Sequence, residues 1–335
     1  PQSPEARLQE MVKAMKKAGA RGKYDCILGL SGGTDSSYMA WWAHQQGLRP
    51  LVVHLDNGWN SELAVKNIEN ICLKLGWDLH THVINWEEFR DLQLAYMRAS
   101  VVDIEVLTDH AIYAVVYELA KKYGVRYTLN GYNYATEAIM PKGWTFNKRD
   151  YTNIRDIWEH HGSGRKLRTF PRVPFFKALW YHWFLRLESI YVLNYLPYNK
   201  SEAKEIITRE LDWRDYGGKH FESVFTKFYQ IYILPRKFGI DKRKAHLSNL
   251  ICSGQITREQ ALAELQQPLY DPAEMEEELQ FILKKFNLSA AEFEAIMQTP
   301  VRRHEDYKTD QHYWNRYFAV LRFLKWPLRL IGKGR

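Results

Sequence analysis

Four short apolar segments alternate with helical patterns in the first half of the chain, and this alternation constrains the fold most strongly. The apolar segments cover residues 24–30, 49–57, 78–85 and 126–131. The clearest helical pattern covers residues 109–124, with Gly124 as the stop and an apolar stripe of Ile112, Val115, Val116, Leu119 and Tyr123. This order predicts a doubly wound parallel α/β sheet, in which ligands bind beyond the carboxyl ends of the strands.

The second half changes character after about residue 150 and becomes helical and aromatic, with few strand candidates. Three helix starts are well marked, by capping boxes at Thr257–Gln260 and Ser289–Glu292 and by the pair Asp271–Pro272. We expect an N-terminal helix in residues 1–22 and a nucleotide-binding α/β domain in residues 23–165. Residues 166–335 should form a mainly helical, aromatic-rich domain that ends in a basic helix.

The segment SGGTDSS, residues 31–37, follows the first apolar segment and precedes a helical pattern. Gly32 and Gly33 let the backbone approach an anion, the helix N-terminus supplies partial positive charge, and three serines add donors. The segment matches neither the Walker spacing nor the dinucleotide-binding spacing of glycines. The residues therefore predict a different kind of phosphate-binding loop. The alternative is a glycine turn in which Asp35 or Ser36 is an ordinary N-cap.

Charge and cysteine usage narrow the classes further. The net charge of +8 is concentrated in residues 301–335, where nine Lys or Arg face three Asp or Glu, so the body of the chain is nearly balanced and nucleic acid is not the expected partner. Cys26, Cys72 and Cys252 are far apart and form no CxxC pair, which favours a reducing, cytoplasmic compartment. Charged residues interrupt the longest apolar-aromatic segment, 175–196, so we expect no membrane span.

SGGTDSS after a buried strand resembles the SGGxDS loop of the PP-loop ATP pyrophosphatase superfamily, which includes GMP synthetase, asparagine synthetase and tRNA thiolases. A closer resemblance, from about residue 23 to 275, is to the N-acetyl sugar amidotransferases of O-antigen and flagellar glycan synthesis. It is carried by VVHLDNGWNS (52–61), LTDHAIYA (107–114), LNGYNYATE (129–137), YGGKHFESVFTKFYQ (216–230) and KFGIDKRKAHLSNLICSGQITREQAL (237–262). Family members usually carry a zinc-binding, cysteine-rich segment ahead of the loop; this sequence starts at Pro1 without it, which suggests that a preceding part is missing.

The resemblance implies an ATP- and Mg²⁺-dependent ligase of lipopolysaccharide biosynthesis that acts on a nucleotide-activated N-acetyl sugar. The amide oxygen attacks the α-phosphate, pyrophosphate leaves, ammonia adds to the imidate carbon, and AMP departs to give an acetamidine. Charge builds on the leaving pyrophosphate, so positioned donors and cations should dominate catalysis. Implied partners are a glutaminase and a cyclase-like subunit, similar to those of imidazole-glycerol-phosphate synthase, that supply the ammonia.

The resemblance also implies roles for individual residues. ATP would contact the loop and the strand ends through Ser31, Gly32, Gly33, Asp35, Ser36, Ser37, Val53, His54, Leu55, Asp56, Asn130 and Gly131. Lys219 and His220 would bring positive charge to the phosphates, with Arg243 as the next candidate.

Mg²⁺ would be held by Asp35 and Glu137, and the substrate by Asn133, Glu137, Trp144 and His246. Asp109 and His110 form a carboxylate-imidazole pair suited to accepting a proton from ammonia, unless Asp109 is only an N-cap.

Other interpretations remain open from the sequence. Tryptophans 144, 158, 180, 183 and 213 would stack on a ligand or, as we favour, pack in the core. The basic amphipathic pattern of residues 313–330 would lie on an anionic membrane surface, dock a partner or pack on its own domain. A tRNA-modifying enzyme with the same adenylation chemistry is the main alternative function. The absence of cysteine beside Asp109 argues against sulfur transfer. The third possible function is that of a sensor that binds an adenine nucleotide without turnover.

Overall fold

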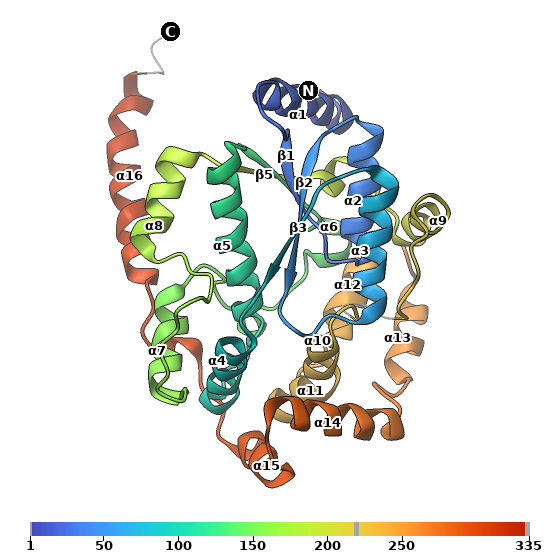
Figure 1. Cartoon of the computed structure of the whole chain (residues 1–335), viewed down its shortest axis with the longest axis vertical. Coiled ribbons are helices and arrows are strands. Elements are labelled where there is room, and N and C mark those ends of the chain that lie inside the picture. The colour runs from blue at the N-terminus through green and yellow to red at the C-terminus, as the bar shows by residue number, and fades with distance from the viewer. Residues whose placement is uncertain (1, 218–220, 332–335) are drawn as a thin grey trace.

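A five-stranded parallel sheet forms the centre of the molecule (Figure 1). The structure is a computed structural model that describes residues 2–217 and 221–331, with side chains up to residue 322. The strand order is β3-β2-β1-β4-β5, with bounds β1 (Cys26–Gly29), β2 (Pro50–Asp56), β3 (Leu79–Val83), β4 (Tyr127–Asn130) and β5 (Glu188–Tyr191). All neighbours pair in parallel, which confirms the predicted doubly wound α/β fold.

The strand order reverses between β1 and β4. Leu28 of β1 lies opposite Val52 of β2 on one side and opposite Leu129 of β4 on the other. The chain runs outward to β2 and β3 in one direction and to β4 and β5 in the other. Such a switch point leaves a crevice at the carboxyl ends of the strands, which is where ligands bind in this class of sheet.

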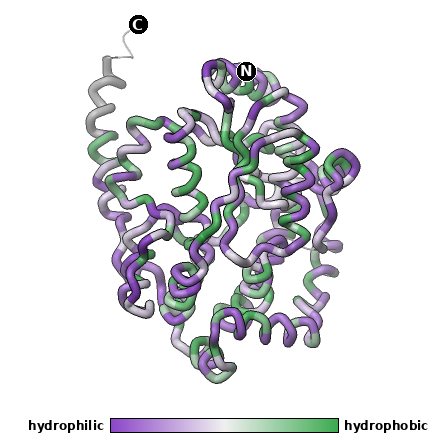
Figure 2. Tube along the Cα trace, viewed as in Figure 1, coloured by the Kyte–Doolittle hydropathy of each residue, from purple (hydrophilic) through white to green (hydrophobic). Residues whose placement is uncertain are grey.

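Side chains alternate between two hydrophobic cores, one on each face of the sheet. Ile27 and Val53 belong to one core, whereas Leu28 and Val52 belong to the other. One face is covered by α1 (Pro4–Gly19), α2 (Thr34–Gln45), α3 (Glu62–Leu75) and α9 (Lys200–Leu211), and the other by α4 (Trp86–Ala99), α5 (Val106–Tyr123) and α7 (Tyr151–His161). Figure 2 shows hydrophobic residues along the central strands and mixed residues on the surrounding helices.

The remaining helices are mostly short and follow one another closely. Their bounds are α6 (Tyr134–Glu137), α8 (Phe175–Trp180), α10 (Val224–Phe228), α11 (Leu234–Phe238), α12 (Arg243–Cys252), α13 (Arg258–Gln266), α14 (Pro272–Phe286), α15 (Ala290–Gln298) and α16 (Gln311–Ile331). Both expected capping boxes are present, and Asp271 caps α14. The predicted helix starts are confirmed because side chains within three residues of each start determine them.

The fifth strand corrects the expected division of the chain. Residues 188–191 pair with β4 over their whole length, although they lie inside the part expected to be helical. The α/β sheet therefore does not end at residue 165. Its edge strand β5 follows β4 only after an insertion of 57 residues, 131–187.

Helix α5 also differs from its predicted stripe. It starts at Val106, and Gly124 ends it in the left-handed conformation, as expected. Val115 and Leu119 are buried, but Ile112 is 39% exposed and faces the large cavity described below. His110 lies on the buried face of this helix, together with Leu107 and Ala114.

Within the described residues, no helix is both long enough and apolar enough to span a bilayer, as the interrupted apolar segment predicted.

Candidate functional site

The loop after β1 is pressed tightly against α3. Gly32 has φ +80°, and a Cβ atom at this position would lie 2.7 Å from the carbonyl oxygen of Ala64. A side chain here would meet both an unfavourable backbone conformation and a backbone atom that cannot move aside. This position therefore requires glycine, and the loop is held in one shape at the amino end of α2.

Hydroxyl groups close the loop on itself. The backbone N–H of Ser31 donates to Ser36 Oγ at 3.3 Å, and the N–H of Gly33 donates to Ser31 Oγ at 3.2 Å. Ser36 Oγ donates to the carbonyl of Gly33 at 3.2 Å. Gly33 is the N-cap of α2 and has no side chain with which to cap it. The hydroxyl of Tyr216, from far along the chain, hydrogen-bonds to Thr34 in the first turn of the helix.

Residues far along the chain support the loop from behind. The indole N–H of Trp213 donates to the carbonyl of Gly32 at 2.8 Å, and Trp213 is buried. The hydroxyl of Tyr198 donates to Asp35 Oδ1. Burial, followed by the charge of Asp35, raises the pKa of Tyr198. Trp213 was expected in the core, and its hydrogen bond to the loop was not visible from the sequence.

A cavity of about 670 Å³ opens at the switch point between β1 and β4. It is lined by the carboxyl-end residues of β1, β2 and β4, by α5 and by segments around residues 144–149 and 222–230. Its size suits a substrate together with part of a nucleotide. The residues predicted for the site that line it are Ser31, Val53, His54, Leu55, Asp109, Asn130, Gly131 and Trp144.

Two hydrogen bonds hold His54 as a neutral imidazole in the cavity wall. Its Nδ1 bonds to the carbonyl of Leu30 at 3.1 Å, and its Nε2 faces the side-chain amide of Asn60 at 3.1 Å. Because the carbonyl can only accept, Nδ1 carries the proton and Nε2 accepts from Asn60. Burial lowers the pKa of His54. Asp56 accepts from the N–H of Gly58 at 2.9 Å and does not line the cavity, so it shapes the turn after β2 instead of contacting a ribose there.

His110 is a correction to the predicted proton acceptor. Its Nδ1–H donates to the carbonyl of Lys148 at 2.9 Å, and its Nε2 accepts the backbone N–H of Val173 at 3.1 Å. The side chain is fully buried, and burial lowers its pKa to about 4. With both nitrogens bonded to backbone, His110 fastens α5 to neighbouring segments and has no site left for a substrate proton.

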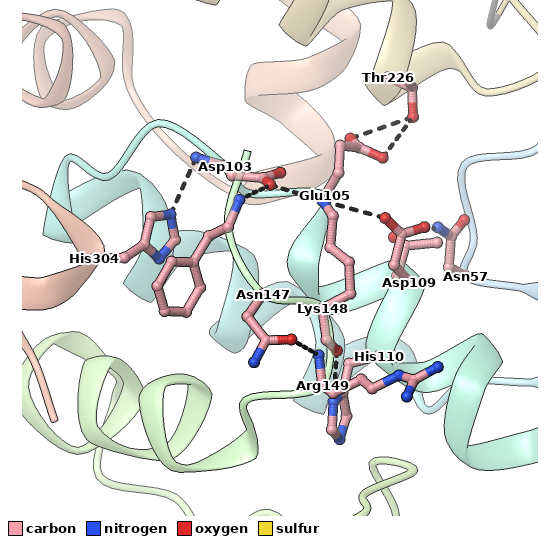
Figure 3. Close-up of polar contacts among 12 residues, drawn as sticks. Asn57, Asp103, Glu105, Asp109, His110, Asn147, Lys148, Arg149, Thr226 and His304 are labelled. Atoms are coloured by element: carbon pink, nitrogen blue, oxygen red, sulfur yellow. Dashed lines mark hydrogen bonds and ion pairs between the residues drawn. The ribbon is translucent and has the colours of Figure 1, made fainter. Parts of the chain in front are cut away.

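Asp109 faces the cavity within a cluster of buried charges (Figure 3). Lys148 Nζ lies 2.7 Å from Asp103 and 3.2 Å from Asp109, and so it bridges the two carboxylates. Burial lowers the pKa of Lys148, but Asp109 and Asp103 outweigh it and raise the pKa above its usual value. Asp109 is not the N-cap of α5, because Glu105 occupies that position.

Glu105 and Lys242 complete the cluster. Both oxygens of Glu105 accept from Thr226 Oγ1 at 3.3 Å. Burial raises the pKa of Glu105 to about 7, and the charge of Asp109 adds to this rise. Burial has the opposite effect on the base Lys242, whose pKa it lowers, and Lys242 also lines the cavity. Sequence reasoning missed Glu105, Lys148 and Lys242, although Glu105 and Lys242 lie within two residues of segments that carry the family resemblance.

Several predicted residues lie outside the lining of this cavity. Arg243 pairs with Asp241 at 2.9 Å and donates to the carbonyl of Gln267 at 2.9 Å, which joins α12 to the end of α13. Its charge is thus used structurally, whereas the adjacent Lys242 lines the cavity. The others outside the lining are Gly32, Gly33, Asp35, Ser36, Ser37, Asn133, Glu137 and His246.

Two of these have clear structural positions. Asn133 is buried, and its side chain caps α6 by accepting the N–H of Thr136 at 2.9 Å. Ser37 is also buried, and its hydroxyl is shielded from solvent. These geometries correct the expected substrate contact of Asn133 and the expected ATP contact of Ser37.

Asp35 and Glu137 lie near the same hydroxyl. The charges of both carboxylates raise the pKa of Tyr198, so loop and α6 converge there. Carboxylate oxygens are ligands that Mg²⁺ prefers, usually one or two from the protein with the rest from water and phosphate. Among the described residues, no group of three or more His, Cys, Asp or Glu could hold a metal by itself. Lys219 and His220 lie outside the described residues.

Three other tryptophans were also expected to pack in the core, and the structure places them differently. Trp158 packs against the main core and donates to Asp91 at 2.7 Å, as expected of a core residue. Trp180 and Trp183 are 41% and 51% exposed, so their predicted place in the core is wrong.

Comparison with known proteins gives one family match and several likenesses to solved structures. Residues 222–321 match the family model described as "LPS biosynthesis protein WbpG-like, C-terminal domain". Comparison with curated proteins gives no significant match.

Among solved structures, NMN synthetase from Francisella tularensis is 19% identical with a TM-score of 0.31, covering 40% of this chain and 57% of that one. An NH₃-dependent NAD synthetase from Campylobacter jejuni is 12% identical with a TM-score of 0.33, covering 48% of this chain and 73% of that one. The chain thus spans little more than half of the first of these. Residues 222–321 are thus similar to a WbpG-like C-terminal domain, and this match overlaps the last part of the predicted resemblance.

Proposed function

We propose that the chain is an ATP-dependent amidotransferase of lipopolysaccharide biosynthesis. It adenylates the N-acetyl oxygen of a nucleotide-activated sugar and replaces that oxygen with ammonia, releasing AMP and pyrophosphate. The observation that carries the proposal is the SGGTDSS loop, held in one shape at the amino end of α2 beside the switch-point cavity, in a chain whose residues 222–321 match the WbpG-like C-terminal domain model. A phosphate-binding helix end beside a pocket of substrate size supports nucleotide chemistry.

ATP would lie across the carboxyl end of the sheet. Its adenine would contact the backbone of residues 53–55, which line the cavity, and its phosphates would reach Ser31 and the N–H groups at the start of α2. Asp35 and Glu137 would hold Mg²⁺ beside the phosphates. When bound, Mg²⁺ neutralises charge that develops on the leaving pyrophosphate. Lys219 and His220 are retained in this proposal as the cationic partners of the phosphates.

The sugar substrate would occupy the rest of the cavity. Trp144 and Tyr113 supply ring surfaces, and the guanidinium of Arg149 lies 4.8 Å from the ring centre of Tyr113. Arginine beside an aromatic ring suits a nucleotide diphosphate, which offers both charge and a flat base. The N-acetyl group would then point toward Asp109, which lies on the facing helix α5.

Asp109 is the proposed proton acceptor. Ammonia attacks the imidate carbon, forming the new carbon-nitrogen bond, and the nitrogen loses a proton to the Asp109 carboxylate as the bond from carbon to the AMP oxygen breaks. Lys148, 3.2 Å away, holds this carboxylate in place. Ammonia would come from a separate glutaminase with a cyclase-like partner. None of the cysteines lines the cavity, so we assign no glutaminase nucleophile to this chain.

The test is a mass spectrum of acetamido nucleotide-sugars after incubation with the chain, ATP, Mg²⁺ and ammonium. We expect one sugar to show the small mass decrease of an amide that becomes an amidine. Asp109→Asn should abolish this product while ATP binding persists, and Ser201→Ala, an exposed change on α9, is the control. Pyrophosphate release that is the same with and without the sugars would contradict the substrate assignment. Release stimulated only by tRNA would favour the alternative function.

A further inference from the structure

A surface outside the cavity lining combines exposed aromatic rings with positive charges. It lies on α8, on the π-helical turn of residues 181–185 and on α16, which run side by side along one edge of the molecule (Figure 1). We call it the aromatic surface and define it by Phe176, Trp180, Trp183, Phe184, Tyr313 and Phe318. Phe176 is 80% exposed and Phe184 is 71% exposed, which is rare for phenylalanine in the absence of a partner.

Ring contacts connect the two helices into one patch. Phe175 packs with its ring centre 5.5 Å from Phe176 and 4.9 Å from Trp314 of α16. Trp314 in turn stacks on Phe318 at 5.8 Å, and Trp180 stacks on Phe184 at 5.5 Å. The rings within each of these sets are therefore ordered by one another, unlike isolated surface side chains.

Positively charged side chains lie next to the aromatic surface, on α5 and on α16. Lys121 Nζ lies 5.0 Å from the ring centre of Trp180. The nearby carboxylate of Glu118 is neutralised by an ion pair with Lys177 and accepts the hydroxyl of Tyr181. On α16, Arg316 and Arg322 are exposed, and they belong to the basic segment identified in the sequence.

We propose that the aromatic surface docks on an anionic lipid surface. Interfacial aromatic rings interleaved with lysine and arginine are typical of proteins that lie on a membrane, where rings enter the headgroup region and cations meet acidic lipids. The cores of protein-protein interfaces are instead depleted in lysine. A symmetric contact with a second copy would bring like charges together. The proposal does not depend on the proposed function.

Vesicle flotation of the whole chain tests the proposal. Vesicles of phosphatidylglycerol with phosphatidylethanolamine are compared with vesicles of phosphatidylcholine, at low salt and at high salt. We expect binding to the acidic vesicles only, weakened by salt. Trp183→Ser with Phe184→Ser should reduce the bound fraction about tenfold, because two rings no longer enter the interface. Leu73→Ser is the matched control, since Leu73 is 78% exposed on α3 of the opposite side of the sheet.

A second variant guards against local unfolding of the π-helical turn. Arg316→Glu with Arg322→Glu leaves every ring in place and should also reduce binding about tenfold, as each charge contributes near an acidic surface. Equal binding to phosphatidylcholine, no binding to either vesicle, or unchanged binding by both double variants would overturn the proposal. Dimerisation in light scattering that Trp183→Ser and Phe184→Ser abolish would also overturn it, in favour of a second copy.

Discussion

Replacing Glu105 by glutamine tests how strongly the cavity wall perturbs a carboxyl group. Glu105 sits between Thr226 and the carboxylate of Asp109, and burial is the main cause of its raised pKa, about 7. In the unfolded chain a glutamate has its ordinary pKa. Folding therefore favours the protonated form, so Glu105 costs the folded state nothing at low pH. It becomes destabilising as the pH rises from the unfolded pKa of about 4.5 to the folded pKa of about 7.

The magnitude follows from the two pKa values. A rise from 4.5 to about 7 corresponds to about 3 kcal/mol once both states are fully ionised. Glutamine keeps the shape and hydrogen bonds without the charge. The free energy of unfolding of Glu105→Gln minus that of the wild type should therefore grow from about 1 kcal/mol near pH 5 to about 3 kcal/mol near pH 8.

The assay is urea unfolding of both proteins at four pH values between 5 and 8, followed by circular dichroism. Taking the difference removes other titrating groups, such as Asp310, whose pKa burial and Asp150 raise to about 7. Glu69→Gln on the exposed face of α3 serves as the control, because a solvated charge contributes little. A difference between Glu105→Gln and wild type that stays constant across this range would refute the reasoning.

Three further predictions concern the loop and the opposite end of β1. Gly32→Ala should cost at least about 2 kcal/mol of stability and abolish ATP binding in calorimetry, because its Cβ would clash with the carbonyl of Ala64; unchanged ATP affinity would contradict this. Trp213→Phe should weaken ATP binding about fivefold, since the carbonyl of Gly32 loses its 2.8 Å donor, and equal affinities would show that the hydrogen bond does not shape the loop. Asp25→Asn should lower the free energy of unfolding by about 2 kcal/mol, as it breaks the pair with Arg49, yet leave ATP affinity unaltered because it lies before β1; loss of both would show that the two ends of the strand are coupled.

Much of the fold was predictable because its signals are local. Strands β1 and β2 are short apolar runs, and each capping box lies within four residues, so pattern and structure agree there. Strand β3 is the exception, because all its residues are exposed or half-buried although a buried strand was expected. Strand β5 has no such signal. Its residues 188–191 follow an aromatic helical stretch and become a strand only by pairing with β4. That pairing depends on tertiary contacts, which short-range sequence patterns do not predict.

The site divides in the same way. The loop and the end of β2 were predicted, since glycines and hydroxyls after an apolar run have a meaning of their own. His110 was misassigned because α5 buries the face that carries Leu107, His110 and Ala114, which is not the face of the predicted apolar stripe. The charge cluster was missed because Lys148 meets Asp103 and Asp109 across about forty residues of sequence, and Thr226 meets Glu105 across 121. Contacts of this separation follow only from the finished fold.

The late position of β5 has a consequence for how the protein is made. During synthesis the ribosome releases the loop of residues 31–37 long before the strand that completes the sheet and the tryptophan that hydrogen-bonds to Gly32. Until residues 188–191 emerge, β4 stays an open edge, and until residue 213 emerges the loop lacks its rear support. A fragment cut at residue 165 would keep that unfinished state permanently, so the sheet with its loop and the helical half cannot be separated by dividing the gene there.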